Sequence, residues 1–378
     1  MNEKFEIVIT TLLGVEAFTA REIKRLGYDD VKTEDGRVTF VGDINAVARA
    51  NMWIRTGERV FIKLGEFDAK TYDELFEGTK SLPWEMWITK NSAFPVKGHT
   101  LKSKLHSERD CQAIIKKAVA DRLTQKYGVS WFEETGAAYQ IQFSLMKDRA
   151  TLMIDTSGEP LHKRGYRPKS NLAPLRETVA SAMVMMSYWK FEYPLCDPFC
   201  GSGTIPIEAA MFKKNIAPGL RRSFAYEDFE QFDSSIKKSA IDEAKDSVRD
   251  LPLQIYASDI DSDTVMIAEA NIKNAGLDKI IVPTVKNAIN FKSDLPYGTI
   301  ITNPPYGERL GDKEECEILY GQVGRMYSKL KDWSCYILAP DGNFEECFGK
   351  RASKRRKVYN GMIKCNIYQY FGAKPQKK

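Results

Sequence analysis

Hydrophobic and polar positions follow short periods in the first third of the chain. They predict a strand, a helix, two strands that turn near Asp35-Gly36, a second helix and a further strand. This βαββαβ order is typical of a ferredoxin-like α+β sandwich, which we expect over residues 1–66. The two helices are expected over residues 15–26 and 44–53, and the outer strands over residues 5–10 and 59–65.

A second α+β unit is predicted over residues 67–156. Residues 157–174, which are rich in Gly, Pro, Lys and Arg, indicate a linker into the last part of the chain. The elements expected in the second unit are a helix near 72–80, a strand near 94–97, a long helix over 107–127 and strands over 139–145 and 150–154.

From Leu175 onward, longer helices alternate with short apolar strands. This alternation predicts an α/β fold, a doubly wound and mostly parallel Rossmann-like sheet over residues 175–378. Ligands of such sheets bind outside the carboxyl ends of the strands, so we expect the chemistry where those strands end. The expected strands are 194–197, 254–258, 280–285, 299–302 and 335–338.

Composition limits the classes of protein to which the chain can belong. With 378 residues, 43% of them hydrophobic, the chain is long enough for two or three domains with real cores. The net charge of +5 permits an anionic partner without demanding one, so any nucleic-acid argument must come from local clusters of charge.

The seven cysteines are scattered and form no CxxC pair, which argues against zinc and disulfides and indicates reduced thiols in the cytoplasm. The N-terminal residues lack the layout of a signal peptide. No run of 18 apolar residues occurs, so no membrane partner is expected.

The first motif that carries chemistry is DPFCGSGT at residues 197–204, between a predicted strand and a helix. Glycines at 201 and 203 allow a sharp turn and a close approach to a ligand, and the helix N-terminus offers N–H groups. The third glycine of a dinucleotide fingerprint is missing. A G-x-G sequence is also compatible with an ordinary tight turn, but the strand–turn–helix context favours a binding loop.

Polar residues end the next two strands. The sequence ASDID at residues 257–261 puts a carboxylate where α/β folds hold ribose hydroxyls, although an acid that caps the following helix is the alternative. We predict that Asp259 contacts the ribose and that Asp261 caps the helix. The third strand ends at Asn287-Ala288, where a side-chain amide suits the edge of an adenine.

The fourth strand ends in Asn303-Pro304-Pro305-Tyr306. Two prolines fix the backbone and remove two N–H donors, so carbonyls point into the site as acceptors. The exocyclic amine of a base is a poor nucleophile, and acceptors such as the Asn303 amide and the Pro304 carbonyl would position it and enrich its nitrogen in electrons. Tyr306 offers a face to a base flipped out of its stack. A proline-rich turn with a buried tyrosine is the alternative interpretation.

The order DPFCGSGT, ASDID, NPPYGERL resembles that of class I methyltransferases acting on amino groups of bases. The resemblance implies S-adenosylmethionine as cofactor, lying over Gly201 and Gly203, and catalysis at residues 303–306 mainly by in-line positioning, without a metal. The cofactor contacts that it implies are Asp197, Phe199, Gly201, Gly203, Thr204, Asp259, Ile260, Asn287, Ala288 and Asn303.

Longer stretches resemble one subfamily. SGEPLHKRGYR at 157–167, APLRET at 173–178 and residues 197–220 are similar to the THUMP-containing guanine-N2 methyltransferases of large-subunit ribosomal RNA. The resemblance covers nearly the whole chain. It implies a ferredoxin-like domain over 1–66, a THUMP RNA-binding domain over 67–156, a linker over 157–174 and a methyltransferase domain over 175–378.

RNA contacts are expected in three places. HTLKSKLHS at residues 99–107 resembles the THUMP signature and suits phosphates, although a solvated helix start is the alternative. The basic run at 350–357 suits an RNA backbone or an exposed loop equally, and basic side chains of the linker would line the RNA path. The predicted contacts are Lys102, Ser103, Lys104, Arg164, Arg167, Arg309, Lys354, Arg355 and Arg356.

Three interpretations therefore compete. An RNA guanine-N2 methyltransferase is favoured by the THUMP-like segment and by the Gly-Glu-Arg that follows NPPY. A DNA adenine-N6 methyltransferase would need a region that recognises DNA, and the first third of the chain does not resemble one. A non-catalytic RNA-binding protein would be expected to have lost one of the motif loops, yet both are intact. We also expect that a chain without residues 1–155 would still fold and bind cofactor.

Overall fold

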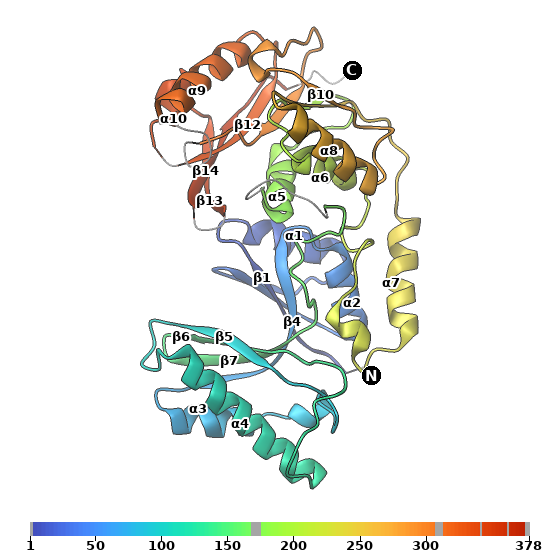
Figure 1. Cartoon of the computed structure of the whole chain (residues 1–378), viewed down its shortest axis with the longest axis vertical. Coiled ribbons are helices and arrows are strands. Elements are labelled where there is room, and N and C mark those ends of the chain that lie inside the picture. Colours follow the sequence, from blue (N-terminus) through green and yellow to red (C-terminus); the bar gives the residue numbers. More distant parts are fainter. Residues whose placement is uncertain (1–2, 168–174, 307–312, 341, 361–362, 375–378) are drawn as a thin grey trace. The chain divides into compact units, whose positions relative to one another are not determined.

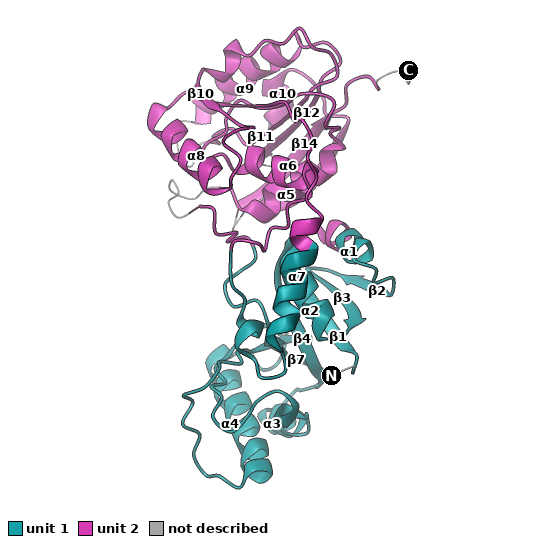
Figure 2. Ribbon diagram, turned by 90° about the vertical axis from the view of Figure 1, so that its right-hand side faces the viewer, with its two compact units in different colours: residues 1–11, 20–161, 222–243 teal, residues 12–19, 162–221, 244–378 magenta. Residues whose placement is uncertain are grey.

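The computed structural model describes the chain apart from residues 1–2, 168–174, 307–312, 341, 361–362 and 375–378. The described residues form two compact units, and Figure 2 shows that each unit is assembled from separate stretches of the chain. No helix in the described part is long and apolar enough to cross a membrane. Unit 1 comprises residues 1–11, 20–161 and 222–243, and unit 2 comprises residues 12–19, 162–221 and 244–378.

The first elements have the predicted βαββαβ order (Figure 2), which confirms the ferredoxin-like region, and Figure 1 shows them in the colours of the chain's N-terminal part. Helix α2 begins where Asp43 accepts the N–H of Ala46 at 3.0 Å, a side-chain cap that satisfies one free donor of the first turn. The elements are β1 (Phe5–Thr11), α1 (Glu16–Arg25), β2 (Val31–Glu34), β3 (Arg37–Gly42), α2 (Ile44–Trp53) and β4 (Gly57–Asp68).

Unit 1 contains one continuous seven-stranded sheet in the order β2-β3-β1-β4-β7-β6-β5. Strand β4 runs through both predicted domains, because Ile62 pairs with Ile7 of β1 on one side and with Ile154 of β7 on the other. The ferredoxin-like and THUMP regions therefore share a sheet. The remaining elements are α3 (Tyr72–Lys80), the 3-10 helix η1 (Trp84–Met86), β5 (Val96–Leu101), α4 (Glu108–Tyr127), β6 (Ile141–Met146) and β7 (Arg149–Asp155).

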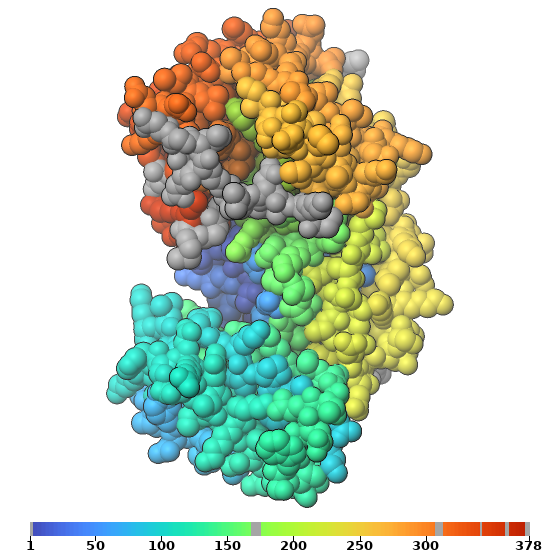
Figure 3. Space-filling view, in the orientation of Figure 1, coloured from blue at the N-terminus to red at the C-terminus, as the bar shows by residue number. Residues whose placement is uncertain are grey.

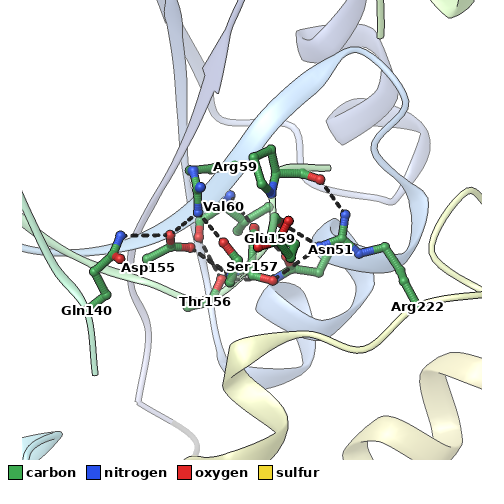
Figure 4. A network of polar contacts seen from close by, with 11 residues as sticks. Asn51, Arg59, Val60, Gln140, Asp155, Thr156, Ser157, Glu159 and Arg222 are labelled. Atoms are coloured by element: carbon green, nitrogen blue, oxygen red, sulfur yellow. Dashed lines mark hydrogen bonds and ion pairs between the residues drawn. The ribbon is translucent and has the colours of Figure 1, made fainter. Parts of the chain in front are cut away.

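A polar network joins the two halves of unit 1 where the chain leaves β7 (Figure 4). Asn51 of α2 donates to the Thr156 hydroxyl at 2.9 Å and accepts from the Ser157 hydroxyl at 2.7 Å. The buried carboxylate of Asp155 accepts the N–H of Ser157 at 2.8 Å and pairs with Arg59. Because these groups satisfy one another away from water, the network fixes the path of the chain after β7.

Residues 222–243 belong to unit 1, although they follow the first motif in sequence and were expected within the domain over 175–378. They contain the 3-10 helix η2 (Ala225–Asp228) and most of α7 (Ser234–Asp246). The ring of Phe229 stacks on Tyr139 at 4.1 Å, and the Tyr139 hydroxyl accepts the N–H of Glu230 at 3.0 Å. Arg222 donates to the carbonyls of Pro160 and Glu159, as Figure 4 shows.

Unit 2 contains the doubly wound sheet that the sequence predicts, in the order β10-β9-β8-β11-β12-β14-β13. The first five strands are parallel, and β14 and β13 form an antiparallel hairpin at one edge. The strands are β8 (Leu195–Asp197), β9 (Ile255–Asp259), β10 (Pro283–Val285), β11 (Thr299–Thr302), β12 (Ser334–Pro340), β13 (Lys354–Asn360) and β14 (Ile363–Tyr370).

Helices cover both faces of this sheet. Ile301 of β11 packs into one core with α5 (Glu177–Ser187), α6 (Thr204–Lys213) and α8 (Ser262–Asn274), whereas Ile300 packs into a second core with α9 (Lys313–Tyr327) and α10 (Phe344–Phe348). Neighbouring residues of a strand point to opposite faces, so an apolar run such as residues 299–302 is what burial on both sides requires. The first core also takes in Val15 and Phe18 from the N-terminal stretch.

Candidate functional site

The carboxyl ends of β8, β9, β10 and β11 surround a pocket of about 510 Å³ in unit 2. This is the edge at which doubly wound sheets bind ligands, beside the position where the strand order reverses between β8 and β11. Of the predicted site residues, Gly203 does not line the pocket, and those that do are Asp197, Phe199, Gly201, Thr204, Asp259, Ile260, Asn287, Ala288, Asn303, Pro304, Pro305 and Tyr306.

The turn between β8 and α6 has the geometry that its glycines predict. Gly201 and Gly203 have φ angles of 52° and 81°, in the left-handed region that side chains rarely adopt. The N–H of Cys200 donates to the carbonyl of Ser258 at 2.9 Å, and the N–H of Gly201 donates to the Asp259 carboxylate at 3.0 Å. These two bonds tie the first motif to the end of β9.

The two acids after β9 have different partners. Asp261 caps α8, as predicted, because its side chain accepts the N–H of Asp263 at 3.1 Å. The hydroxyl of Thr264 also donates to Asp261, which lowers the pKa of this exposed carboxyl. Asp259 accepts the N–H groups of Gly201 and Asp261 and lines the pocket. Its predicted contact with a ribose stays a prediction.

Asp197 is almost fully buried at the end of β8. Burial raises the pKa of its carboxyl from 3.8 to about 7, against the effect of two donors, the Thr302 hydroxyl at 2.7 Å and the N–H of Phe199 at 3.2 Å. Thr302 is the last residue of β11, so this hydrogen bond connects the first motif with the strand that ends in NPPY.

Asn287 follows β10 and begins a short 3-10 helix, Ala288–Asn290. Its side-chain oxygen accepts the N–H of Ile289 at 3.1 Å. Asn287 and Ala288 both lie at the pocket, as the sequence predicts, and their contact with an adenine stays a prediction.

The NPPY segment presents an acceptor at the pocket. The side-chain oxygen Oδ1 of Asn303 is buried and has no hydrogen-bond partner among the residues that the structure describes. A buried polar atom without a partner costs free energy, so it indicates a place for a donor from a ligand. Tyr306 is 7% exposed and packs with Tyr320 of α9, whose hydroxyl donates to the carbonyl of Pro305 at 3.0 Å.

Several residues of this site are absent from the sequence-based prediction. Tyr320 supports NPPY from α9, and Leu319 of the same helix lines the pocket together with Leu175. Nothing local in the sequence marks the residues of α9, because their part in the site depends on how α9 packs against β11. Thr302 could have been predicted from the sequence, because its hydroxyl directly precedes NPPY.

The predicted RNA contacts of the THUMP region lie between β5 and α4. Lys102 and Lys104 are exposed, and the segment from β5 to α4 that contains them is coloured cyan in Figure 3. Ser103 is partly buried, and its hydroxyl accepts the N–H of Asp148 at 3.0 Å while Ser107 caps α4. The two lysines are placed where RNA can reach them, and this contact stays a prediction.

The burial of the two linker arginines, Arg164 and Arg167, contradicts their predicted role as RNA contacts. Arg164 is 2% exposed, and its guanidinium lies 3.6 Å from the buried Glu208 of α6. Arg167 pairs with the buried Glu177 of α5 at 2.9 Å. Both cations point into unit 2, because two buried carboxylates need positive partners. These two arginines therefore neutralise buried carboxylates rather than line an RNA path, whereas Lys163 is exposed.

The basic run at 350–357 was expected as a segment or loop between strands, but Lys354, Arg355 and Arg356 lie within strand β13. Arg355 pairs with Glu345 at 3.3 Å, and Arg356 donates to the carbonyl of Gly14 at 2.7 Å. Lys354 is exposed. Arg309, the remaining predicted RNA contact, lies outside the described residues, as do the neighbouring Gly307 and Glu308.

Comparison with known protein families places three domains along this chain. Residues 6–61 match the RlmL ferredoxin-like domain, residues 69–155 match the THUMP domain, and residues 164–369 match the RMKL-like methyltransferase domain. The last match covers more than half of the chain. The chain belongs to the RMKL-like methyltransferases.

Relatives agree with this membership. "Putative RNA methyltransferase YpsC" of Bacillus subtilis is 44% identical over 100% of this chain and 98% of that protein. "Ribosomal RNA large subunit methyltransferase K/L" of Psychromonas ingrahamii is 33% identical over 96% of this chain, but the match spans 49% of that relative. Among solved structures, SMU.472, a putative methyltransferase complexed with SAH, has a TM-score of 0.94, 40% identity and full coverage of both chains.

The family, the fold and the cofactor predicted from the sequence are thereby confirmed, and the cofactor of this methyltransferase is S-adenosylmethionine. The pocket fits such a molecule in two respects. Its turn with two left-handed glycines leaves the backbone open to close approach, and carboxylates and amides from four strand ends face one space.

Proposed function

We propose that this protein methylates the exocyclic N2 amine of a guanine in large-subunit ribosomal RNA. Three features support the proposal: the RNA named in the K/L relative, the THUMP match over residues 69–155, and the NPPY motif after β11. The subfamily resemblance of residues 157–167 and 197–220 favours guanine over adenine.

The observation that carries the proposal is the buried Oδ1 of Asn303 without a partner among the described residues. An amine presents two hydrogens, and it is the donor that this acceptor lacks. A hydrogen bond from the amine to Asn303 would hold the nitrogen in place and increase its electron density, so the nitrogen attacks more readily.

The residues around Asn303 keep this acceptor in place. Pro304 and Pro305 restrict the backbone, and the Tyr320 hydroxyl holds the Pro305 carbonyl at 3.0 Å. Thr302, directly before Asn303, bonds to the buried Asp197 at 2.7 Å. The acceptor is therefore fixed before the substrate arrives, which lowers the entropy that must be lost on binding.

We propose that the cofactor contacts the turn at Gly201, with its ribose at Asp259 and its adenine near Asn287. All three residues line the pocket. The cofactor supplies a methyl group on a positively charged sulfur, which is reactive enough that no strong general base is needed. The chain's own part is to align the amine nitrogen with that carbon and to exclude water. Tyr306 would lie against the flipped base.

The competing function is methylation of adenine N6 in DNA, because the NPPY motif suits either amine. The THUMP match favours RNA. In both cases the same acceptor, Asn303, contacts the amine, so mutation of this residue cannot separate the two substrates.

Methylation in vitro separates the substrates. Purified protein with radiolabelled S-adenosylmethionine is incubated with unmodified 23S ribosomal RNA or with double-stranded DNA, and the labelled nucleosides are separated after digestion. We expect label in N2-methylguanosine from RNA. Label in N6-methyl-2′-deoxyadenosine from DNA would contradict the proposal, as would label in another RNA nucleoside.

A further inference from the structure

Arg167 lies behind the pocket rather than on an outer surface. Its side chain is only 11% exposed and contacts three of the described residues of unit 2. The guanidinium pairs with Glu177 at 2.9 Å, donates to the carbonyl of Leu175 at 3.1 Å and donates to the hydroxyl of Thr204 at 2.9 Å. Leu175 and Thr204 both line the pocket.

Thr204 connects Arg167 to the turn of the first motif. It is the first residue of α6, directly after Gly203, and its hydroxyl lies 3.2 Å from that of Ser202. The turn is held elsewhere by Asn271 of α8, which donates to the Ser202 carbonyl at 2.9 Å, and by Asp259, which accepts the N–H of Gly201. Arg167 completes this support on the side of α5 and α6.

Only a forked side chain can make these contacts together. The Arg167 guanidinium directs Nη2 to Glu177 and Nη1 to Leu175 and Thr204. A lysine ammonium has donors around one nitrogen, so it can keep the ion pair but cannot also span the other two acceptors in the same geometry.

We propose that Arg167 is a positioning residue for the cofactor: it acts through Thr204 and Leu175 and sets the wall of the pocket against which the cofactor lies. This inference rests on the proposed function, because it takes the pocket to be the cofactor site. This role differs from a contact with RNA. Among the described residues, the contacts of Arg167 lead to Glu177, Leu175 and Thr204, and not to Asn303 or to an exposed surface of unit 2.

The test compares Arg167→Lys and Thr204→Val with the wild-type protein in three measurements: affinity for SAH by titration calorimetry, affinity for 23S RNA by filter binding, and steady-state kinetics with S-adenosylmethionine varied. Both variants should bind SAH about ten- to a hundredfold more weakly, because a hydrogen bond to a charged group is worth roughly 1.5–3 kcal/mol. KM for S-adenosylmethionine should rise by a similar factor, while kcat and RNA affinity stay within about twofold.

The double variant separates positioning from general destabilisation. If Arg167 acts through Thr204, the two losses will overlap, and the double variant will bind SAH little worse than Thr204→Val alone. Thr204→Ser, which keeps the hydroxyl, should lose less SAH affinity than Thr204→Val. Arg221→Lys is the matched control, because Arg221 bonds to the carbonyl of Ala275 in the same unit and does not line the pocket.

Unchanged SAH affinity in both variants would overturn the proposal, as would a loss of RNA affinity with SAH affinity intact. If Arg167→Lys does not fold, Thr204→Val decides the question, because it leaves the pair of Arg167 with Glu177 in place. Failure of the wild-type protein to bind SAH would instead contradict the proposed function.

Discussion

At the scale of single residues, the site is defined by two polar side chains at the ends of strands, a buried carboxyl and a buried amide oxygen without a partner among the described residues. Asn303 offers a buried acceptor, and Asp197 keeps a carboxyl in a position that water does not reach. Sequence reasoning found both residues because each ends a predicted strand within a motif. It failed for Arg164 and Arg167, because basic residues in a Gly-rich linker look like a surface and their buried partners come from distant helices.

Replacement of Asn303 by alanine should reduce kcat by roughly a hundredfold or more, because one preorganised group at the reacting atom is typically worth that much. SAH affinity should stay within a few-fold of the wild-type value. Asn303→Asp is the control, since it keeps an acceptor of the same shape and should retain more activity than Asn303→Ala. Full activity of Asn303→Ala in a single-turnover assay would refute the role of this residue.

Asp197 should make stability depend on pH. Its pKa is about 7 in the folded protein and 3.8 as its ordinary value, so between these values the folded state binds the additional proton. Its contribution to the free energy of unfolding is therefore present below about pH 4 and falls as pH rises through 7, by up to about 1.4 kcal/mol per unit. The urea stability of the wild type should therefore fall relative to that of Asp197→Asn, whose neutral amide does not titrate, as pH rises from about 4 to about 7. The same dependence of urea stability on pH in both proteins would exclude a raised pKa at Asp197.

At the scale of elements, the sequence predicted the parallel strands and the four loops at their ends, because apolar runs and motif residues mark them locally. It missed the edge hairpin: β13 begins with Lys354-Arg355-Arg356-Lys357, a run that has no apolar alternation and so resembles a loop. It did not predict that the ferredoxin-like and THUMP regions, which the family matches also separate, share one sheet, since no local signal shows that β4 pairs on both sides.

The contact between α9 and α10 depends on a glycine. A Cβ atom at Gly324 would lie 1.9 Å from the carbonyl oxygen of Phe348, so Gly324→Ala must push the helices apart. We expect a loss of about 1–3 kcal/mol in unfolding free energy, even though alanine favours helices, and reduced activity because α9 carries Tyr320. Gly342→Ala, where a Cβ meets nothing within 4 Å, should leave denaturant midpoint and activity unchanged. Equal midpoints for the two variants would contradict the packing argument.

At the scale of the whole molecule, the chain passes between its two units several times. Residues 12–19 belong to unit 2, where Val15 and Phe18 are buried in the core, and residues 222–243 belong to unit 1. This arrangement therefore argues against the expectation from the sequence that residues 156–378 fold alone. A linear pattern of motifs cannot reveal such exchanges, because they depend on which core buries each segment.

A chain of residues 156–378 should consequently fail to fold cooperatively. It loses two large side chains from a core, at several kcal/mol in total, and it exposes Phe229 and Phe232, which are buried in unit 1. Co-expression with residues 1–155 as a separate chain should restore a soluble complex. Calorimetry of the fragment checks this prediction. A sharp unfolding transition together with SAH binding by the fragment alone would contradict the claim that the fragment needs residues 1–155 to fold.

The central claim is that this methyltransferase modifies the N2 amine of a guanine in large-subunit ribosomal RNA. Mass-spectrometric mapping of nucleosides in ribosomal RNA from cells lacking the gene tests it most directly. The claim predicts that one N2-methylguanosine disappears from 23S RNA and returns when the wild-type gene is supplied, but not with Asn303→Ala. An unchanged set of N2-methylguanosines, or the loss of a different modified nucleoside, would contradict it.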